Sequence, residues 1–353
     1  MRFAGLVNLG NTCFMNAVLQ ALVPFREVFE HESVEEGSLT ESLSSVLSRL
    51  VTDNEPEDAT SPVPPVIPAR FLFDFVRAFP YFKGFEQHDA FEFLQLLMDH
   101  MHSEGSEDST ASADAAPPAT ITSLVGPQLL QMSREALKAS ARSDTNPIST
   151  HFMGQQLNVA KCYNCSVMTA KFTPHTVVSL PIVNSTSGDV PVSSIENCFD
   201  LYFATNPLLK EDQLFCSTCN SKQDGAMKNL LTINPKVLIV HFKRFTFSDG
   251  AARKLDHRIA FDLELILPDL EQTVNGTDLI RYELQSVVYH VGSMSDGHYV
   301  AMSKRGDDWY FFNDADEPEK LDKVYNVVDE AAYILFYRKV EFAILSEDQP
   351  ATP

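Results

Sequence analysis

The sequence predicts an α+β fold, because helical patterns come early in the chain and strand patterns come late. Apolar residues recur at helical spacing from Ala90 to Met101, which indicates an amphipathic helix that faces a core. Later segments favour β structure through alternating β-branched and aromatic residues. These segments read VLIVHFKRF, YELQSVVYHV, HYVAMSK, WYFF and AAYILFYRK.

Composition limits the class of protein. The 353 residues suffice for one large domain or two ordinary ones, and a hydrophobic fraction of 44% is typical of a chain with a buried core. No apolar run approaches the ~18–20 residues of a membrane span, and the start shows no secretory segment. We therefore expect no membrane partner and a location in the cytosol or nucleus.

Acidic residues outnumber basic ones, 48 to 27, for a formal net charge of −21. This balance argues against nucleic acid as the main partner, because phosphate binding requires a basic face. It suits a basic or neutral protein substrate. Solubility alone explains the acidity about equally well.

Two insertions and a tail interrupt the structured blocks. Residues 52–70 contain five prolines and are expected to form an extended surface loop. Residues 103–123 are rich in Ser, Ala, Asp and Pro, a composition that predicts disorder. Residues 341–353 are expected to end outside the fold.

Cys13 is a candidate nucleophile in the segment GLVNLGNTCFMNAVLQAL. Gly10 and Asn11 permit a tight turn, and Asn11 or Thr12 can cap a helix that begins near Cys13. A thiol at a helix N-terminus meets free backbone N–H groups and the positive end of the helix dipole, which predicts a lowered pKa. The same turn offers N–H donors to an oxyanion. The alternative is a buried cysteine inside an amphipathic helix.

His298 is the candidate base, in the segment SDGHYVAMSKRGDDWYFFNDADE. Two strand patterns flank a turn at Gly306 and predict a hairpin. Folding at this turn places His298 opposite roughly 313–315, so that Asn313 or Asp314 can reach the imidazole and hold its tautomer. A plain surface hairpin, the alternative, would leave the histidine without a purpose.

Four of the six cysteines form two C-x-x-C pairs, Cys162 with Cys165 and Cys216 with Cys219. Two such pairs can complete a closed tetrahedral zinc site, which leaves no open position for water and is therefore structural. The 50 residues between the pairs exceed the length of an ordinary zinc ribbon, and strands between them would explain this. A redox pair is the alternative. Cys198 is expected in the core.

The segment around Cys13 matches the pattern Gly-Leu-x-Asn-x-Gly-Asn-Thr-Cys-x-Met-Asn with a following Leu-Gln, and it resembles the Cys box of ubiquitin-specific proteases. The segment around His298 resembles their His box, Gly-His-Tyr-x-Ala followed by Phe-Asn-Asp. The resemblance implies that Cys13 is the nucleophile and His298 the general base. It further implies that Asn8 donates its side-chain amide to the oxyanion beside the Cys13 N–H. Asn313 is the first choice for orienting the base, and Asp314 is the second.

The segment QHDAFEF resembles the family's Gln-x-Asp-x-x-Glu-Phe helix start. By this resemblance Asp89 and Glu92 meet the arginine-bearing tail of ubiquitin, as carboxylate–guanidinium pairs would. Stabilisation of the helix N-terminus is the simpler role, and both can hold. His88 and Phe91 depart from the commoner polar residues. His290 also matches a family position and is expected to be structural.

The resemblance covers most of residues 5–340 and implies a papain-like cysteine peptidase. The implied parts are a helical thumb (about 1–102), zinc-binding fingers (about 151–230) that grip ubiquitin's globular body, and a β-rich palm (about 231–340). The implied activity is hydrolysis of the bond after the C-terminal glycine of ubiquitin through a thioester, with one structural zinc and no catalytic cofactor. A peptidase for another ubiquitin-like modifier and an inactive ubiquitin-binding scaffold are the alternatives.

Overall fold

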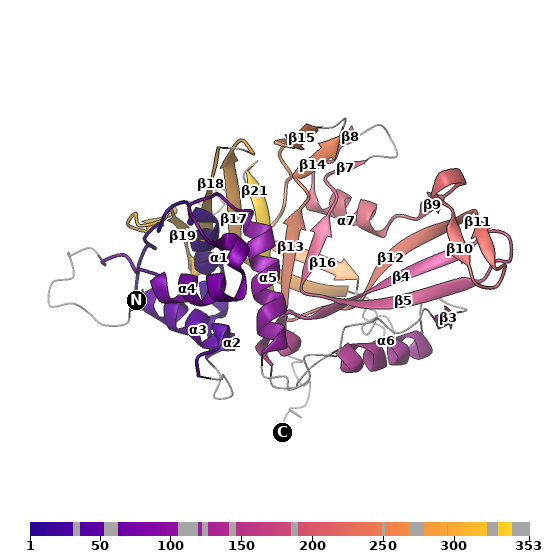
Figure 1. The fold of residues 1–353 in the computed structure, drawn as a ribbon, viewed down its shortest axis with the longest axis horizontal. Helices are drawn as coiled ribbons and strands as arrows, with labels where there is room; N and C mark the ends of the chain where they lie inside the picture. Colours follow the sequence, from indigo (N-terminus) through magenta and orange to yellow (C-terminus); the bar gives the residue numbers. More distant parts are fainter. Residues whose placement is uncertain are drawn as a thin grey trace, which may run out of the picture.

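The fold is α+β, as predicted, with helices α1 to α5 at one end, sheets over the rest, and α6 and α7 packed on those sheets (Figure 1). The computed structural model describes most of the chain. The described residues are 1–30, 36–52, 63–104, 119–121, 126–140, 146–184, 190–248, 251–268, 279–294, 296–322 and 331–340. None of the helices among them is long and apolar enough to cross a membrane.

The thumb is the helical part. Its helices are α1 (Cys13–Leu22), α2 (Arg26–Phe29), α3 (Leu39–Arg49), α4 (Ala69–Ala78) and α5 (Ala90–Ser103). The predicted amphipathic helix corresponds to α5, whose apolar positions are buried. A short ladder of β1 (Arg2–Phe3) and β2 (Val51–Thr52) lies at the edge of the thumb.

The palm is an eight-stranded sheet in the order β20-β19-β18-β17-β21-β13-β6, with β16 paired to β17. Its strands are β6 (Val177–Leu180), β13 (Val237–Phe242), β16 (Glu264–Pro268), β17 (Leu279–Gly292), β18 (Gly297–Arg305), β19 (Asp308–Phe312), β20 (Glu319–Lys320) and β21 (Ala332–Lys339). All of the strand segments predicted from the sequence lie in or next to this sheet. Two small ladders, β7 (Val183–Asn184) with β8 (Val190–Pro191) and β14 (Phe245–Ser248) with β15 (Ala251–Lys254), adjoin it.

The fingers are a five-stranded sheet in the order β3-β5-β4-β12-β9. Its strands are β3 (Ala119–Ile121), β4 (Gly154–Cys162), β5 (Met168–His175), β9 (Asn206–Leu208) and β12 (Gly225–Ile233). The ladder of β10 (Leu214–Cys216) with β11 (Ser221–Gln223) lies at the tip, and helix α6 (Pro127–Ser140) packs on one face (Figure 1). Strands therefore do occupy the interval between the two C-x-x-C pairs, as the spacing predicted.

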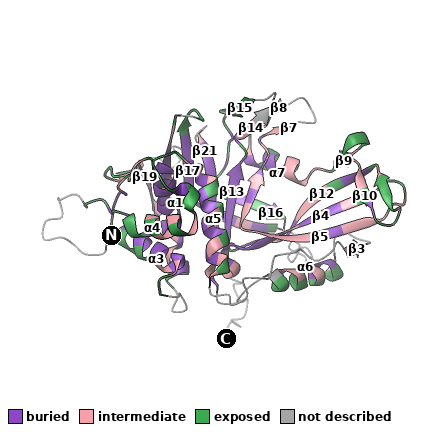
Figure 2. Ribbon diagram, viewed as in Figure 1, coloured by how far each residue is buried: buried purple, intermediate pink, exposed green. Residues whose placement is uncertain are grey.

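Both faces of the palm sheet are buried, which explains its nearly continuous apolar strands. Val288 and Ala301 belong to the core shared with the thumb helices. Their strand neighbours Val287 and Val300 belong to a second core on the opposite face, which is covered in part by helix α7 (Ile195–Phe203). Figure 2 shows this burial along the central strands, in contrast to the more exposed fingers.

Two predicted boundaries were wrong where the structure describes them. Helix α4 begins at Ala69, inside the predicted surface loop 52–70. Residues 119–121, inside the stretch 103–123 predicted to be disordered, form β3 and pair with β5. Most of that stretch, the central part of the loop and the tail 341–353 lie outside the described residues.

All ten residues of α1 are buried, so its polar side chains need partners inside the protein. The guanidinium of Arg305, at the end of β18, supplies one set. Its Nη2 donates to the backbone oxygen of Gln20 at 3.1 Å and to Oε1 of the same residue at 2.8 Å. The Gln20 amide in turn donates to the Ala4 carbonyl at 2.8 Å. Arg305 therefore joins the helix that bears Cys13 to the strand that bears His298.

We expect Arg305→Leu to lower the free energy of unfolding by about 2–4 kcal/mol, because both Gln20 acceptors lose their donor in a buried site. Urea denaturation measures this loss. The matched control is Arg70→Met, which removes an exposed ion pair with Glu41 and should cost at most about 1 kcal/mol. Equal losses in the two variants would contradict the role given to Arg305.

Candidate active site

The turn before α1 is tight, as predicted, with Gly10 and Asn11 at φ values of 99° and 59°. The predicted cap was wrong, because Thr12, the N-cap residue, makes no side-chain capping bond. Asn8 organises the turn instead. Its Oδ1 accepts the N–H of Gly10 at 3.1 Å and the N–H of Thr12 at 2.9 Å. These two bonds fix the Asn8 amide, with its nitrogen directed away from the turn.

The Cys13 thiol lies at the first residue of α1 and is only 4% exposed. Burial has the largest effect on this thiol and raises its pKa, whereas the nearby backbone N–H of Tyr299 acts as a donor that lowers it. The negative charge of Asp314 raises the pKa further. Together, burial and this charge have a larger effect than the donor, so the pKa of Cys13 is raised. The predicted lowering was therefore wrong. A neutral thiol needs a proton acceptor before it can attack.

His298 is held by a chain of two hydrogen bonds. Its Nε2 lies 2.7 Å from Oδ1 of Asn313, and Nδ2 of Asn313 donates to Asp316 at 2.6 Å. A carboxylate only accepts, so the amide nitrogen faces Asp316 and the amide oxygen faces the imidazole. Nε2 therefore carries the proton, and Nδ1 is free to accept one.

The fold packs α1, which begins with Cys13, against β18, which bears His298, although the two residues are far apart in the sequence. Cys13 contacts the N–H of Tyr299, which directly follows His298. No hydrogen bond joins the sulfur to the imidazole in the described part of the chain. The two groups are thus neighbours that are not yet paired.

The side chain of Asp314 binds Asn8 and Asn16, in and next to the turn before Cys13, and makes no hydrogen bond to the imidazole among the described residues. One carboxylate oxygen accepts from Nδ2 of Asn8 and the other from Nδ2 of Asn16, each at 2.8 Å. Its backbone carbonyl accepts the N–H of Leu6, and a Cβ at Gly5 would come within 2.6 Å of that oxygen. Of the two predicted orienters, the structure therefore places Asn313 on the base and Asp314 under Asn8. One N–H of Asn8 remains for another acceptor.

Asp89 already has partners at the start of α5. One carboxylate oxygen accepts the N–H groups of Phe91 at 2.6 Å and Glu92 at 3.1 Å, and the other accepts the Tyr333 hydroxyl at 2.7 Å. Asp89 therefore stabilises the start of α5, the simpler of its two expected roles. Through Tyr333 it also connects the thumb to the palm. Glu92 is exposed and faces solvent. The Phe91 ring stacks on His241 of β13, with centroids 3.8 Å apart.

His290 is buried among aromatic rings on β17. Its ring lies 4.7 Å from the Tyr299 ring and 5.2 Å from the Phe245 ring. Burial, together with the charge of Lys254, lowers the pKa of His290 to about 4. It is therefore neutral at physiological pH and packs as a structural residue.

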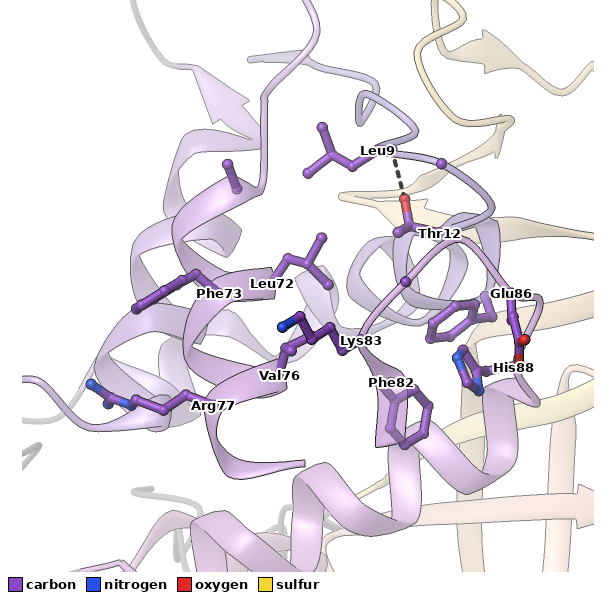
Figure 3. A pocket seen from close by; sticks show the side chains of 14 residues that line it. Leu9, Thr12, Leu72, Phe73, Val76, Arg77, Phe82, Lys83, Glu86 and His88 are labelled. Atoms are coloured by element: carbon purple, nitrogen blue, oxygen red, sulfur yellow. Dashed lines mark hydrogen bonds between the residues drawn. The ribbon is translucent and has the colours of Figure 1, made fainter. Parts of the chain in front are cut away.

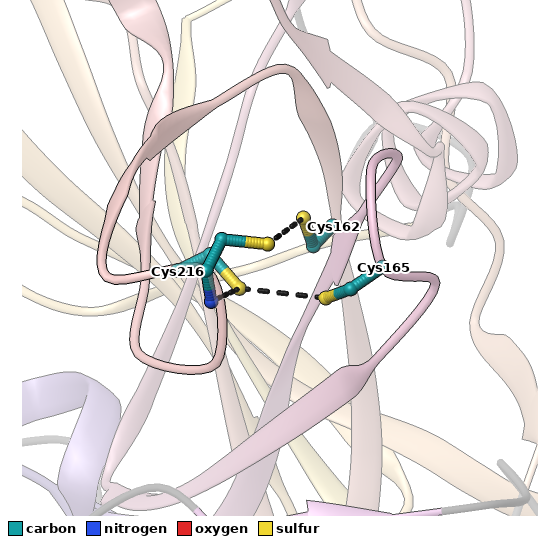
Figure 4. A group of neighbouring side chains, drawn as sticks. Cys162, Cys165 and Cys216 are labelled. Carbon is teal, nitrogen blue, oxygen red and sulfur yellow. Dashed lines mark hydrogen bonds between the residues drawn. The ribbon is translucent and has the colours of Figure 1, made fainter.

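The four paired cysteines cluster at the tip of the fingers (Figure 4). Their sulfurs all lie within 4.8 Å of one another, with 3.9 Å between Cys162 and Cys219 and 3.6 Å between Cys165 and Cys216. These distances are too long for a disulfide. They approach the ~3.8 Å edge of a tetrahedron with metal–sulfur bonds of about 2.3 Å. Asn164 and the N–H of Cys219 donate to sulfurs of the cluster, so the four thiols can hold a metal ion.

Five residues that position these groups were not identified from the sequence: Asn16, Gln20, Tyr299, Arg305 and Asp316. Asn16 and Gln20 stand in the segment around Cys13, where polar residues on an otherwise apolar helix are unusual enough to indicate a role. Tyr299 acts through its backbone, which no side-chain pattern reveals. Asp316 lies just past Asn313 and could have been proposed as its partner.

Comparison with known proteins gives a consistent result. The family model described as ubiquitin carboxyl-terminal hydrolase matches residues 4–337. Ubiquitin carboxyl-terminal hydrolase 4 of Arabidopsis thaliana is 30% identical over 345 residues, covering 95% of this chain and 88% of that protein. Ubiquitin carboxyl-terminal hydrolase 21 of Homo sapiens is 30% identical over 359 residues, and the match covers 96% of this chain but only 61% of that longer protein.

Solved structures show the same fold. The SAGA DUB module of Ubp8, Sgf11, Sus1 and Sgf73 bound to ubiquitin aldehyde contains a chain with a TM-score of 0.67 and 23% identity, covering 96% of this chain and 70% of that one. A SAGA module bound to monoubiquitin gives a TM-score of 0.68, also at 23% identity.

We expect Asp314→Asn to shift the pH profile of Cys13 alkylation to lower pH. The charge of Asp314 raises the thiol pKa, so its removal lowers that pKa and exposes thiolate at a lower pH. Iodoacetamide labelling, followed by mass spectrometry of the Cys13 peptide, measures the profile. Turnover should fall in the same variant, because Asn8 loses its carboxylate partner. A profile that stays in place or moves to higher pH would refute the electrostatic role of Asp314.

Proposed function

Because this chain belongs to the ubiquitin carboxyl-terminal hydrolase family and is a cysteine-type deubiquitinase, we propose that Cys13, His298 and Asn313 perform its acyl transfer. The observation that supports this most strongly is the packing of α1 on β18, which brings the Tyr299 backbone, one residue beyond His298, close to the Cys13 sulfur. His298 directly precedes Tyr299, so this contact supports a pairing of the buried thiol with Nδ1 of the imidazole, the nitrogen that does not face Asn313. The proposed nucleophile begins α1 of the thumb, and the proposed base lies on β18 of the palm, where these two elements pack together.

The reaction begins with proton transfer from Cys13 to Nδ1 of His298. This transfer is needed because burial keeps the thiol neutral, and the imidazolium formed is stabilised through Asn313. The thiolate sulfur then bonds to the carbonyl carbon of the terminal glycine. The carbonyl π pair moves onto oxygen and forms an oxyanion.

The N–H of Cys13 and the remaining Nδ2–H of Asn8 are the donors suited to this oxyanion. Asn8 is held on both sides, by the turn at Oδ1 and by Asp314 at Nδ2, so it need not reorganise during the reaction. A donor of this kind typically supplies about 3 kcal/mol of transition-state stabilisation.

Collapse of the tetrahedral intermediate breaks the bond to the leaving amine. His298 gives its added proton to that amine, and a thioester of Cys13 remains. Water then loses a proton to His298 as it attacks the thioester, and the free carboxyl terminus leaves with the thiol regenerated. Both half-reactions use the same imidazole nitrogen.

Substrate binding is proposed by analogy with the solved relatives, which hold monoubiquitin and ubiquitin aldehyde. Exposed Glu92 is the better candidate for an arginine of the ubiquitin tail, since its carboxylate faces solvent. Asp89 would have to share a carboxylate that already caps α5 and binds Tyr333. A peptidase specific for a different ubiquitin-like modifier would show its preference in the assay described below.

We also propose that the four-cysteine cluster holds zinc. Four thiolates in a closed arrangement suit zinc and leave no position for a catalytic water, so the ion would join the two hairpin loops at the fingertip without entering the chemistry. Unlinked thiols are typical of a reducing compartment. This supports a location in the cytosol or nucleus.

We expect Cys13→Ala to abolish hydrolysis of a fluorogenic ubiquitin C-terminal amide while ubiquitin binding persists. His298→Ala should lose nearly all activity, because no other group takes the thiol proton. The matched control is His290→Gln, which should keep substantial activity, since that ring only packs against its neighbours. Steady-state kinetics on the amides of ubiquitin and of other ubiquitin-like modifiers measure these effects. An indispensable His290 with a dispensable His298 would disprove the assignment.

We expect about one zinc ion per chain by elemental analysis of the purified protein. Cys216→Ser should lower both the zinc content and the melting temperature, because the site joins two separate loops. Cys198→Ser, a buried cysteine outside the cluster, should leave the zinc content unchanged. Protein that is metal-free yet folded and fully active would argue against the zinc site.

A further inference from the structure

A pocket of about 520 Å³ lies in the thumb between α4, the segment 82–88 and the turn before Cys13 (Figure 3). Its walls are mainly apolar and include Leu9, Leu72 and Phe82. A volume of this size accommodates a small ligand or several protein side chains. The reaction described above uses none of these side chains, so the pocket has no role yet.

The pocket directly adjoins the nucleophile. Thr12 and Phe14, the two neighbours of Cys13, both line it. Phe85, in the segment 82–88, contacts the turn before Cys13 at Gly10 and Asn11. A Cβ at Gly10 would come within 2.3 Å of the Phe85 ring, and the Asn11 side chain donates to the Phe85 carbonyl at 2.5 Å.

The same segment also reaches the base. The Gln87 side chain accepts the N–H of Gly297, the residue before His298, at 3.5 Å. In the reaction the leaving amine is bonded to the carbon attacked by Cys13 and takes its proton from His298. The amine therefore departs next to Cys13 and His298, and the segment 82–88 contacts the chain beside both of them, through Phe85 and Gln87.

The rim of the pocket has the character of a protein-binding surface. Phe73, Tyr81 and Phe85 are 67%, 73% and 75% exposed. Exposed aromatic rings around a hollow are typical of protein interfaces, where they act as anchors. In Figure 3 the Lys83 side chain extends across the pocket toward α4, and Arg77 lies at the same end. Arg77 is already paired with Asp74 at 3.6 Å, and Glu86 also lines the pocket, so its charges are mixed and its apolar walls and exposed rings are what a partner would contact.

We propose that this pocket binds the acceptor protein, the partner released with the amine, by taking one of its apolar side chains. The proposal rests on the proposed function, because only a hydrolase of this type has such a leaving protein. The pocket then contributes to the choice among ubiquitinated proteins or ubiquitin chain linkages.

Photo-crosslinking tests the location of the acceptor directly. We would place p-benzoylphenylalanine at Phe73 in the Cys13→Ala enzyme and add each linkage-defined di-ubiquitin, with the donor and acceptor units tagged differently. Crosslinks to the acceptor unit of at least one linkage are expected. The control carries the crosslinker at Ile266, which is 57% exposed on β16 of the palm, and should label the acceptor far less. Crosslinks to the donor unit only, or none with any linkage, would overturn the proposal.

Kinetics separate this proposal from the proposed function. For Phe73→Asp, kcat/KM on the fluorogenic ubiquitin amide, which lacks an acceptor protein, should stay within about twofold. On the di-ubiquitin cleaved best, kcat/KM should fall about tenfold through KM, the loss expected for one interface anchor. Ile266→Asp should change neither. Equal losses on both substrates, or none on either, would overturn the pocket's role, whereas a wild-type enzyme inactive on the amide would instead refute the proposed function.

Discussion

The packing of helix α1 on strand β18 is the contact on which the active site depends. Each element carries one reactive group, and the two groups meet only because the elements are locked in register. Arg305 sets that register at one end by donating to Gln20. At the other end, the Tyr299 backbone lies close to the Cys13 sulfur. Because α1 is buried on every side, it cannot shift along β18 without leaving buried polar groups unpaired.

Burial and a like charge hold the thiol in its neutral form. Asp314 contributes to this even though it stabilises the site in another way, by fixing Asn8 and Asn16. The Asp314 carboxylate thus positions Asn8, the proposed oxyanion donor, and at the same time its charge disfavours the thiolate form of Cys13. Thiolate is therefore expected to form mainly when His298 accepts the proton beside bound substrate. A cysteine of this kind is protected from unselective alkylation and oxidation, which require thiolate.

Local patterns predicted much of this architecture, and tertiary contacts account for what they missed. The strands, the α5 helix, the hairpin that brings Asn313 to His298 and the cysteine cluster follow from periodicity, turn residues and spacing, which are all encoded locally. The sign of the Cys13 pKa shift was wrong, because it depends on burial by distant elements and not on the helix terminus alone. The roles of Arg305 and Tyr299 could not be predicted either, since each acts on a residue nearly 300 positions away. Asp314 could be placed near the site, but only its contacts with Asn8 and Asn16 reveal what it does.

Direct titration of the Cys13 thiol tests the central claim, that the free enzyme holds a neutral nucleophile positioned by α1 and β18. Thiolate absorbs near 240 nm, and the difference between wild type and Cys13→Ser cancels the cysteines of the fingers. We expect no thiolate difference at neutral pH and its appearance only above the ordinary cysteine range, because burial raises the pKa of Cys13. A full thiolate difference at pH 7 would mean a preformed ion pair with His298 and would contradict this account.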